Sequence, residues 1–255
     1  MFWWMMKNVI LGPWLRLMYR PKAKGLENVP AEGGVILAPN HQSFLDDLLL
    51  PMVTKRRITI LAKADYWDHW YTRWFFKWSG CVPVRREGGS ASMAAIQAAV
   101  DALKDGKMVA LFPEGTRSPD GRLYRGKTGV ARIALEARVP VVPVAIMGTF
   151  ELWPYTRRTP KPGRTELRFG KPLTFERHFD TPTDRFVLRS VTDEIMYEIM
   201  LLSGQEYADE YGSRAKAQIE AAQKAMEAPP VAGPGDDLTV VLPEDASTSA
   251  TKSGS

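Results

Sequence analysis

Cysteine and histidine are scarce in this chain. Among 255 residues there is one cysteine, Cys81, and there are three histidines, His41, His69 and His178. A single thiol excludes a disulfide framework within the chain and any Cys-rich metal site. No histidine stands in a His-x-x-x-His or His-Glu-x-x-His pattern, the spacings with which one helix binds zinc. We therefore expect no bound metal and no cofactor.

A long uninterrupted apolar run is also missing. Residues 1–20 are rich in apolar and aromatic residues, but Lys7, Pro13 and Arg16 interrupt them. A membrane-spanning helix needs about 20 largely apolar residues. The stretch also lacks the charged start and small-residue cleavage site of a signal peptide. Aromatic residues followed by basic ones predict a segment that lies in the membrane interface, and the alternative is a helix packed on its own domain.

The charge is basic and unevenly spread. The net charge is +5, but residues 229–255 carry −3, which leaves +8 on the rest. A basic body suits an anionic partner: nucleic acid, a phosphorylated substrate or a membrane surface. The distribution of tryptophan favours a phosphorylated substrate or a membrane surface over nucleic acid. Three of the eight Trp residues lie in residues 1–14 and four in residues 67–78. The candidate membrane-interface residues are Trp3, Trp4, Trp14, Trp67, Trp70 and Trp74.

Apolar strand-like segments alternate with helical ones, which predicts an α/β fold with a largely parallel or mixed sheet flanked by helices. We expect strands at 34–39, 57–62, 81–84, 107–112, 139–147 and 165–169, the last at a sheet edge, and helices at 43–53, 64–79, 91–105, 127–138 and 182–226. The Pro-, Gly- and Ser-rich residues 229–255 predict a disordered acidic tail. The predicted organisation is a membrane-interface helical anchor at 1–24, one α/β domain at 25–226 and this tail.

His41 and Asp46 are the first candidates for chemistry. An imidazole can take a proton from an alcohol and return it to a leaving group near neutral pH. A carboxylate on its other ring nitrogen would fix the tautomer and stabilise the imidazolium. No Ser or Cys in residues 39–46 is placed as a nucleophile, so the activated hydroxyl would belong to the substrate. The alternative is that Ser43 and Asp46 only form a capping box, or that Asp47 is the acid that matters.

The segment Phe112–Ser118 follows a predicted strand, where ligands bind in open α/β sheets. Gly115 would let the backbone approach a ligand, and the Arg117 fork matches a phosphate. The alternative is a polar turn in which Glu114 and Arg117 pair with each other. Two further cations, Arg86 at the end of a strand and Lys63 before a helix, could each contact an anion or simply be solvated.

Four blocks in this order resemble the PlsC-like glycerolipid acyltransferase family, the 1-acylglycerol-3-phosphate acyltransferases. Asn40-His41 followed by Asp46 is similar to the family's His/Asp motif. The other three blocks are Gly80–Arg86, Phe112–Ser118 and Val139–Ile146. The resemblance covers residues 34–170. Pro83 departs from the pattern, because the family often has an aromatic or aliphatic residue there.

The resemblance implies an O-acyltransferase of phospholipid biosynthesis. His41 would act as general base on the free hydroxyl of 1-acyl-glycerol-3-phosphate, which attacks the thioester of acyl-CoA or acyl-carrier protein to give phosphatidic acid. Asp46 would orient His41. The substrate-binding residues would be Lys63, Arg86, Glu114, Gly115, Thr116 and Arg117. The expected partners are membrane phospholipids, the lysophospholipid and the acyl donor, with no nucleic acid, at the cytoplasmic face of the membrane.

Three alternatives stay open at this point. The acceptor could be another lysolipid or glycerol 3-phosphate. The chain could be a hydrolase that uses water in place of the lipid hydroxyl, which would not need the Arg and Lys residues. It could also be a non-catalytic lipid-binding protein that relies on its Trp-rich surfaces and basic body and has no need of His41.

Overall fold

The structure is a computed structural model that describes residues 2–63, 82–84 and 89–227. The helix predicted at 64–79 and the tail predicted at 229–255 lie outside the described residues. Short helical segments at the N-terminus, α1 (Phe2–Met5), a π-helix (Met6–Ile10) and α2 (Leu11–Tyr19), lead into the main body.

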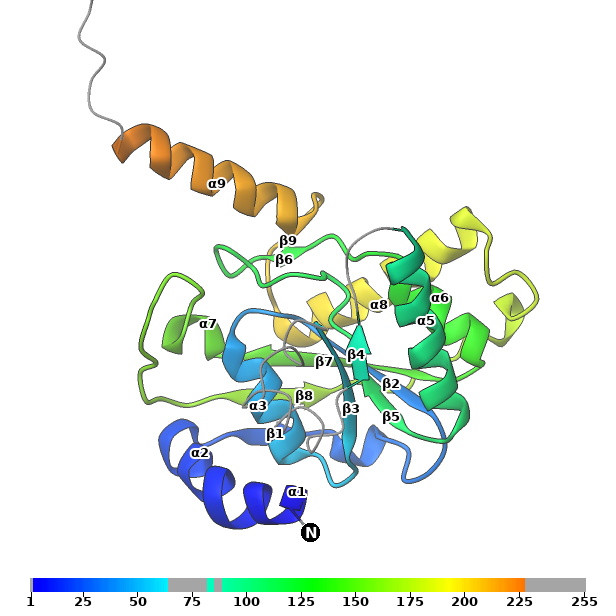
Figure 1. Ribbon diagram of the computed structural model, residues 1–255, viewed down its shortest axis with the longest axis horizontal. Coiled ribbons are helices and arrows are strands. Elements are labelled where there is room, and N and C mark those ends of the chain that lie inside the picture. Colours follow the sequence, from blue (N-terminus) through cyan, green and yellow to red (C-terminus); the bar gives the residue numbers. More distant parts are fainter. Residues whose placement is uncertain (1, 64–81, 85–88, 228–255) are drawn as a thin grey trace, which may run out of the picture.

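A seven-stranded sheet forms the centre of the body (Figure 1). Its order is β1-β8-β7-β2-β5-β3-β4, and all neighbours are parallel except β7 and β8. The predicted α/β fold with a mixed sheet is confirmed. The strands are β1 (Lys22–Lys24), β2 (Val35–Pro39), β3 (Ile58–Lys63), β4 (Val82–Val84), β5 (Met108–Ala110), β7 (Val141–Met147) and β8 (Glu166–Phe169).

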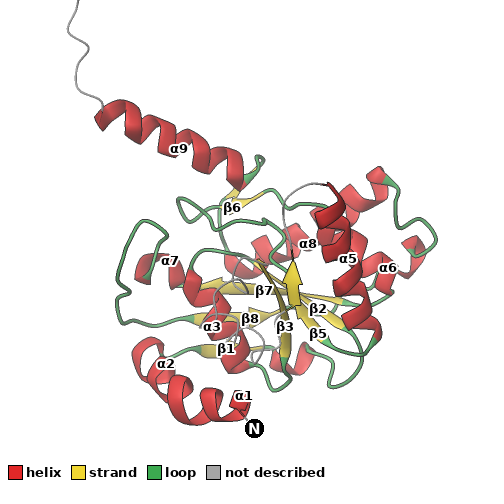
Figure 2. Ribbon diagram, viewed as in Figure 1, coloured by secondary structure: helices red, strands yellow, loops and turns green. Residues whose placement is uncertain are grey.

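Helices cover both faces of the sheet, and Figure 2 shows the strands between the two groups. Side chains alternate along a strand, so Ile36 of β2 faces one core while Val35 and Leu37 face the other. The first core contains side chains of α5 (Gly89–Lys104), α6 (Gly129–Ala137) and α8 (Arg185–Ser203). The second contains side chains of α2 and α3 (Phe44–Val53). Because both faces are buried, the central strands are apolar throughout.

Two sequence predictions about the fold were wrong. The strand at 165–169 is present as β8 but is not at an edge, because the short β1 pairs with it on the outside. The helical pattern at 182–226 is interrupted: α8 ends at Ser203, and the next residue, Gly204, has a left-handed φ of +69°. The chain then forms β9 (Tyr207–Ala208), which pairs with β6 (Leu123–Tyr124), and continues as α9 (Gly212–Glu227).

The topology brings four strand ends together. Strands β7, β2, β5 and β3 are adjacent and parallel, so their carboxyl ends lie along one edge of the sheet. The loop to α3 leaves β2 at this edge, and the segment Phe112–Ser118 leaves β5 beside it. The small sheet of β6 and β9 lies next to these loops (Figure 1). This edge is where an open α/β sheet binds its ligands.

Candidate active site

His41 and Asp46 are in contact at the carboxyl edge. The Nδ1 atom of His41 lies 3.1 Å from Oδ2 of Asp46, and the two side chains are 14% and 0% exposed. His41 sits in the loop after β2, and Asp46 is in the first turn of α3. Because Nδ1 is engaged by the carboxylate, Nε2 is the ring nitrogen left to exchange a proton with a bound molecule.

The same Asp46 oxygen also caps α3. Oδ2 accepts hydrogen bonds from the backbone N–H groups of Gln42 (2.6 Å) and Ser43 (2.8 Å), and the Ser43 hydroxyl accepts from Leu45 N (3.2 Å). The capping box and the contact with His41 are therefore two uses of one carboxylate, not alternatives. Three donors on one oxygen fix the position of the carboxylate, which in turn fixes the imidazole.

Ser43 does not have the geometry of a nucleophile. Its hydroxyl donates to the carbonyl oxygen of Trp153 (2.6 Å) and accepts from Leu45 N, and the residue is fully buried. The base therefore has no serine of its own motif to activate, which leaves a substrate hydroxyl as the group to be deprotonated.

The segment Phe112–Ser118 holds the His41 peptide from both sides. The His41 N–H donates to Oε1 of Glu114 (2.8 Å), and the His41 carbonyl accepts from Ser118 N (2.8 Å). The imidazole also stacks on Phe112, with ring centroids 3.9 Å apart and planes at 28°. These contacts exist because β5, which precedes the segment, is the neighbour of β2.

Glu114 is buried behind the site and connects its loops by hydrogen bonds. It is 1% exposed, and its second oxygen accepts from Tyr124 N (2.9 Å), which links the His41 loop to β6. Both oxygens are therefore occupied by backbone N–H groups, and the carboxylate does not face the surface where a substrate would bind. Burial raises the pKa of Glu114 to about 7, although the hydrogen bonds from Tyr124 and His41 oppose that shift.

This pKa predicts a pH dependence of stability. Between its ordinary pKa of 4.5 and about 7, the folded protein keeps a proton on Glu114 that the unfolded chain has released. The contribution to the free energy of unfolding is therefore fully present below pH 4.5 and is lost as the pH rises to about 7, by up to ~3 kcal/mol. Above about pH 7, Glu114 causes no further change in the free energy of unfolding.

Glu114→Gln should remove this dependence. The variant cannot titrate, and its amide, like the protonated carboxyl group that it replaces, has a single carbonyl oxygen for the two N–H groups. Urea unfolding of both proteins from pH 4.5 to 8.5 measures the difference directly, because all other groups are shared. The free energy of unfolding of the wild-type protein minus that of the variant should fall by up to ~3 kcal/mol between pH 4.5 and about 7; a constant difference would contradict the Glu114 assignment.

Among the remaining residues of the segment, Pro113 and Ser118 are buried, Gly115 is exposed, and Thr116 and Arg117 are half-buried. Gly115 has a φ of +68°, a left-handed conformation that disfavours any side chain. Arg117 is half-buried and makes no hydrogen bond or ion pair with any of the residues that the structure describes. It does not pair with Glu114, so the alternative of an internal Glu–Arg pair is wrong. No described residue therefore competes with a ligand for its guanidinium.

A comparison of the sequence with known families gives a match at this site. The profile of the acyltransferase family matches residues 20–147, which include His41, Asp46 and the segment Phe112–Ser118. The chain belongs to the acyltransferase family. The resemblance seen in the sequence motifs is therefore confirmed.

Named relatives of this acyltransferase share the same region. A chloroplast 1-acyl-sn-glycerol-3-phosphate acyltransferase of Brassica napus is 34% identical over 137 residues, 53% of this chain and 40% of that protein. The 1-acyl-sn-glycerol-3-phosphate acyltransferase of Bacillus subtilis is 30% identical over 154 residues, 60% of this chain and 73% of that protein. The chain thus spans less than half the length of the chloroplast relative.

A solved structure has a similar fold. The crystal structure of the 1-acyl-sn-glycerophosphate acyltransferase PlsC from Thermotoga maritima superimposes with a TM-score of 0.60 at 29% identity and covers 73% of each chain. Because the similarity covers most of this chain, it supports the assignment of one main α/β unit to this acyltransferase.

Not all predicted site residues are placed by the structure. Lys63 is the last residue of β3, so the backbone puts it at the same carboxyl edge as His41. Thr116 follows Gly115 and packs near Gly212 at the start of α9. Arg86, Trp67, Trp70 and Trp74 lie outside the described residues, and their roles stay predictions. Among the described residues, no three His, Cys, Asp or Glu side chains are grouped to hold a metal ion.

Sequence reasoning missed a polar network behind the base. The buried Asn40 side chain accepts from Ile146 N (2.6 Å) and donates to Ile146 O (3.0 Å) and Gln205 Oε1 (2.6 Å). Gln205 donates to the carbonyl of Gly121 (2.7 Å), which also accepts from Gln42. The sequence does place Asn40 at the end of an apolar strand, which could have indicated its hydrogen bonds with Ile146. Gln205 gives no such signal, because it lies 165 residues away in the chain.

The N-terminal helices carry an exposed apolar face. Trp4 and Trp14 are 61% and 48% exposed, while Leu15 and Tyr19 on the other side of α2 are buried in the core. We call the exposed set the N-terminal apolar surface: Trp4, Val9, Ile10, Trp14 and Leu17. No helix in the described ranges is long and apolar enough to span a bilayer. The segment therefore packs on the domain through one face and leaves the other uncovered by described residues.

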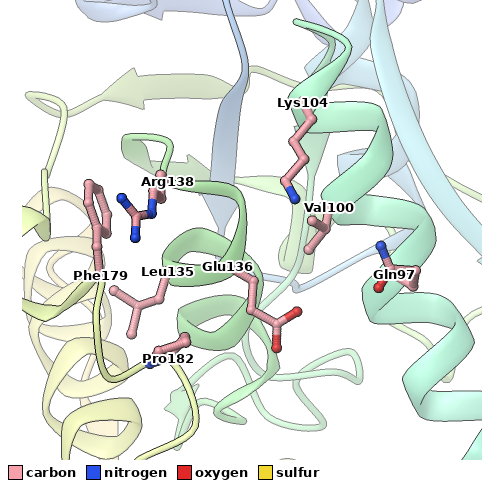
Figure 3. A pocket seen from close by; sticks show the side chains of 8 residues that line it. All are labelled: Gln97, Val100, Lys104, Leu135, Glu136, Arg138, Phe179 and Pro182. Carbon is pink, nitrogen blue, oxygen red and sulfur yellow. The ribbon is translucent and has the colours of Figure 1, made fainter.

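A shallow cavity of about 300 Å³ lies elsewhere, between α5, α6 and the loop that follows Phe179 (Figure 3). It is lined by Gln97, Val100, Lys104, Leu135, Glu136, Arg138, Phe179 and Pro182. None of the predicted site residues lines it. Its Arg138 is already paired with Asp180 (3.3 Å) and lies over the ring of Phe179. The carboxyl edge, and not this cavity, is the candidate active site.

Proposed function

We propose that the chain is a 1-acylglycerol-3-phosphate O-acyltransferase that forms phosphatidic acid in phospholipid synthesis. One observation carries the proposal: an oriented His41–Asp46 pair stands at the carboxyl edge without a nucleophile in its own motif. The named relatives act on 1-acyl-sn-glycerol-3-phosphate according to their names, and they share this region with the chain. The acyl donor is acyl-CoA or acyl-carrier protein.

The reaction needs two proton transfers and no acyl-enzyme. Nε2 of His41 takes the proton of the acceptor hydroxyl as its oxygen attacks the thioester carbonyl. When the tetrahedral intermediate collapses, the C–S bond breaks and the imidazolium returns the proton to the departing thiolate. Asp46 stabilises the imidazolium and holds the ring. General base catalysis of this kind contributes about 10²–10⁴-fold, and the positioning of the two substrates adds several kcal/mol.

The acceptor phosphate is bound by the Phe112–Ser118 segment. Arg117 supplies the guanidinium, and Gly115 lets the phosphate approach the backbone. Lys63 and Arg86 would contribute further positive charge. Glu114 shapes the segment without touching the substrate, because its carboxylate is committed to His41 N and Tyr124 N.

An acceptor panel tests the proposal. Purified protein and labelled acyl-CoA or acyl-carrier protein are incubated with 1-acyl-glycerol-3-phosphate, other lysophospholipids, glycerol 3-phosphate or no acceptor, and the lipid products are identified. Phosphatidic acid should be the main product. Thiol release without any acceptor would indicate a hydrolase, and no turnover with any acceptor would favour a non-catalytic lipid-binding protein.

We also propose that the protein is peripheral or monotopic at the cytoplasmic face of the membrane, held by the N-terminal apolar surface. Aromatic side chains with one apolar and one polar side favour the interface. Replacing Trp3, Trp4 and Trp14 with Ser should lower co-sedimentation with anionic liposomes about tenfold or more. Tyr197→Ser and Leu201→Ser on α8, also exposed, serve as the control. Unchanged binding of the triple variant would contradict the proposal.

A further inference from the structure

A second cation lies beside the Phe112–Ser118 segment and was not among the predicted site residues. A Cβ atom added to Gly115 would lie 3.0 Å from Cδ and 3.1 Å from both Cε and Nζ of Lys127. The Lys127 side chain therefore runs along Gly115, and Lys127 is exposed. The Lys127 backbone is fixed there as well, since its N–H donates to Pro113 O (2.8 Å).

The surroundings of this ammonium are suited to an anion. Within the described part of the chain, Lys127 Nζ makes no hydrogen bond or ion pair, and neither does the Arg117 guanidinium. The backbone N–H groups of Thr116 and Arg117 likewise donate to no described atom, whereas Gly115 N closes the turn on Phe112 O (3.1 Å). Unpaired N–H groups after a left-handed residue form the kind of concavity that binds phosphate.

The nearest acid does not neutralise these cations from the outside. Glu114 precedes Gly115, but its two oxygens accept from His41 N and Tyr124 N inside the protein. The turn and Lys127 thus supply one guanidinium, one ammonium and two N–H groups that have no partner among the described residues. A phosphate monoester carries close to two negative charges at neutral pH, because its second pKa is about 6, whereas a phosphodiester carries one.

We propose that Lys127 is a second cationic ligand of the acceptor phosphate and that, together with Arg117, it selects a dianionic phosphate monoester over a monoanionic phosphodiester. This rests on the proposed acyl transfer to a lysophospholipid. Arg117 alone can bind either head group through its fork, and a second cation attracts a dianion more strongly than a monoanion. Selection then comes from charge number and not from the acyl chain, which the two kinds of acceptor share.

The test compares acceptors that differ only in that charge: 1-oleoyl-glycerol-3-phosphate and its methyl phosphodiester. Lys127→Met keeps the aliphatic part that packs on Gly115 and removes the charge, while Lys127→Arg keeps a cation. Lys104→Met is the matched control, because Lys104 ends α5 just before the amino end of β5. Its side chain lines the cavity shown in Figure 3 and not the carboxyl edge.

Lys127→Met should lower kcat/KM for the monoester about tenfold, mainly through KM, and change it less than about twofold for the diester. Lys127→Arg should restore most of the preference, and Lys104→Met should alter neither acceptor. Equal losses on both acceptors would mean that Lys127 only supports the turn, and no loss on either would mean that it is a solvated surface lysine. Either result overturns the proposal.

A binding measurement separates this inference from the proposed function. Calorimetric titration with hexanoyl-glycerol-3-phosphate and its methyl diester reports head-group selection without turnover. If the protein transfers no acyl group but binds the monoester more tightly, and loses that preference in Lys127→Met, the proposed function fails and the Lys127 assignment stands. If both compounds bind equally to the unaltered protein, the Lys127 assignment fails regardless of catalysis.

Discussion

His41→Ala should lower acyl transfer about 10²–10⁴-fold and leave the fold intact. The side chain is the only described group whose position and chemistry suit it to deprotonate a substrate hydroxyl, since Ser43 is committed to Trp153 O and Leu45 N. The loss should appear in kcat, because the proposed phosphate contacts come from Arg117 and Lys127 and not from the imidazole.

The stability of His41→Ala should change little. Asp46 keeps its two backbone donors, Gln42 N and Ser43 N, so α3 stays capped. Circular dichroism and the melting temperature check this point. His178→Ala is the matched control, since His178 lies in the 3₁₀ helix Glu176–His178 and contacts Arg177. A His41→Ala protein that retained more than about a tenth of the activity would remove His41 from the proposed chemistry.

The main body of the fold could be predicted from the sequence because its elements carry strong local signals. The strand at 34–39 is apolar at every position and the helix at 43–53 starts with a capping box, and both appear as β2 and α3. Strand β1 could not be predicted in the same way. It has three residues, two of them exposed lysines, and it becomes a strand only because β8 offers an edge to pair with.

The contact between His41 and Asp46 could be predicted from the sequence, whereas the residues that support this pair could not. His41 and Asp46 are five residues apart at the start of one helix, so their contact depends on local geometry alone. The inward direction of Glu114 depends on β6, a strand of two residues, which supplies the N–H of Tyr124 as a second donor. Lys127 follows β6 in the chain, and this strand therefore also places the Lys127 side chain over Gly115. A polar loop in a sequence therefore predicts a ligand-binding segment, but not which of its charged side chains point inward.

Asp46→Asn should lower acyl transfer by about 10³–10⁴-fold, close to the effect of removing His41 itself. An amide oxygen in place of Oδ2 could still accept from Gln42 N and Ser43 N, but it carries no charge to stabilise the imidazolium. The amide NH₂ would occupy the place of Oδ1, which is buried and has no hydrogen-bond partner among the described residues. An unsatisfied donor there costs about 1–3 kcal/mol of stability.

Asp47→Asn separates the role of Asp46 from a general effect of charge at the start of α3. Both acids lie in the first turn, so both variants lose a similar favourable interaction with the helix dipole. Only Asp46 contacts the His41 ring, at 3.1 Å, and Asp47 has contacts of its own. Asp47→Asn should therefore keep activity within about threefold, with kcat and KM measured at a temperature where both variants are folded. Equal loss in the two variants would show that the acid at position 46 acts on the helix and not on the base.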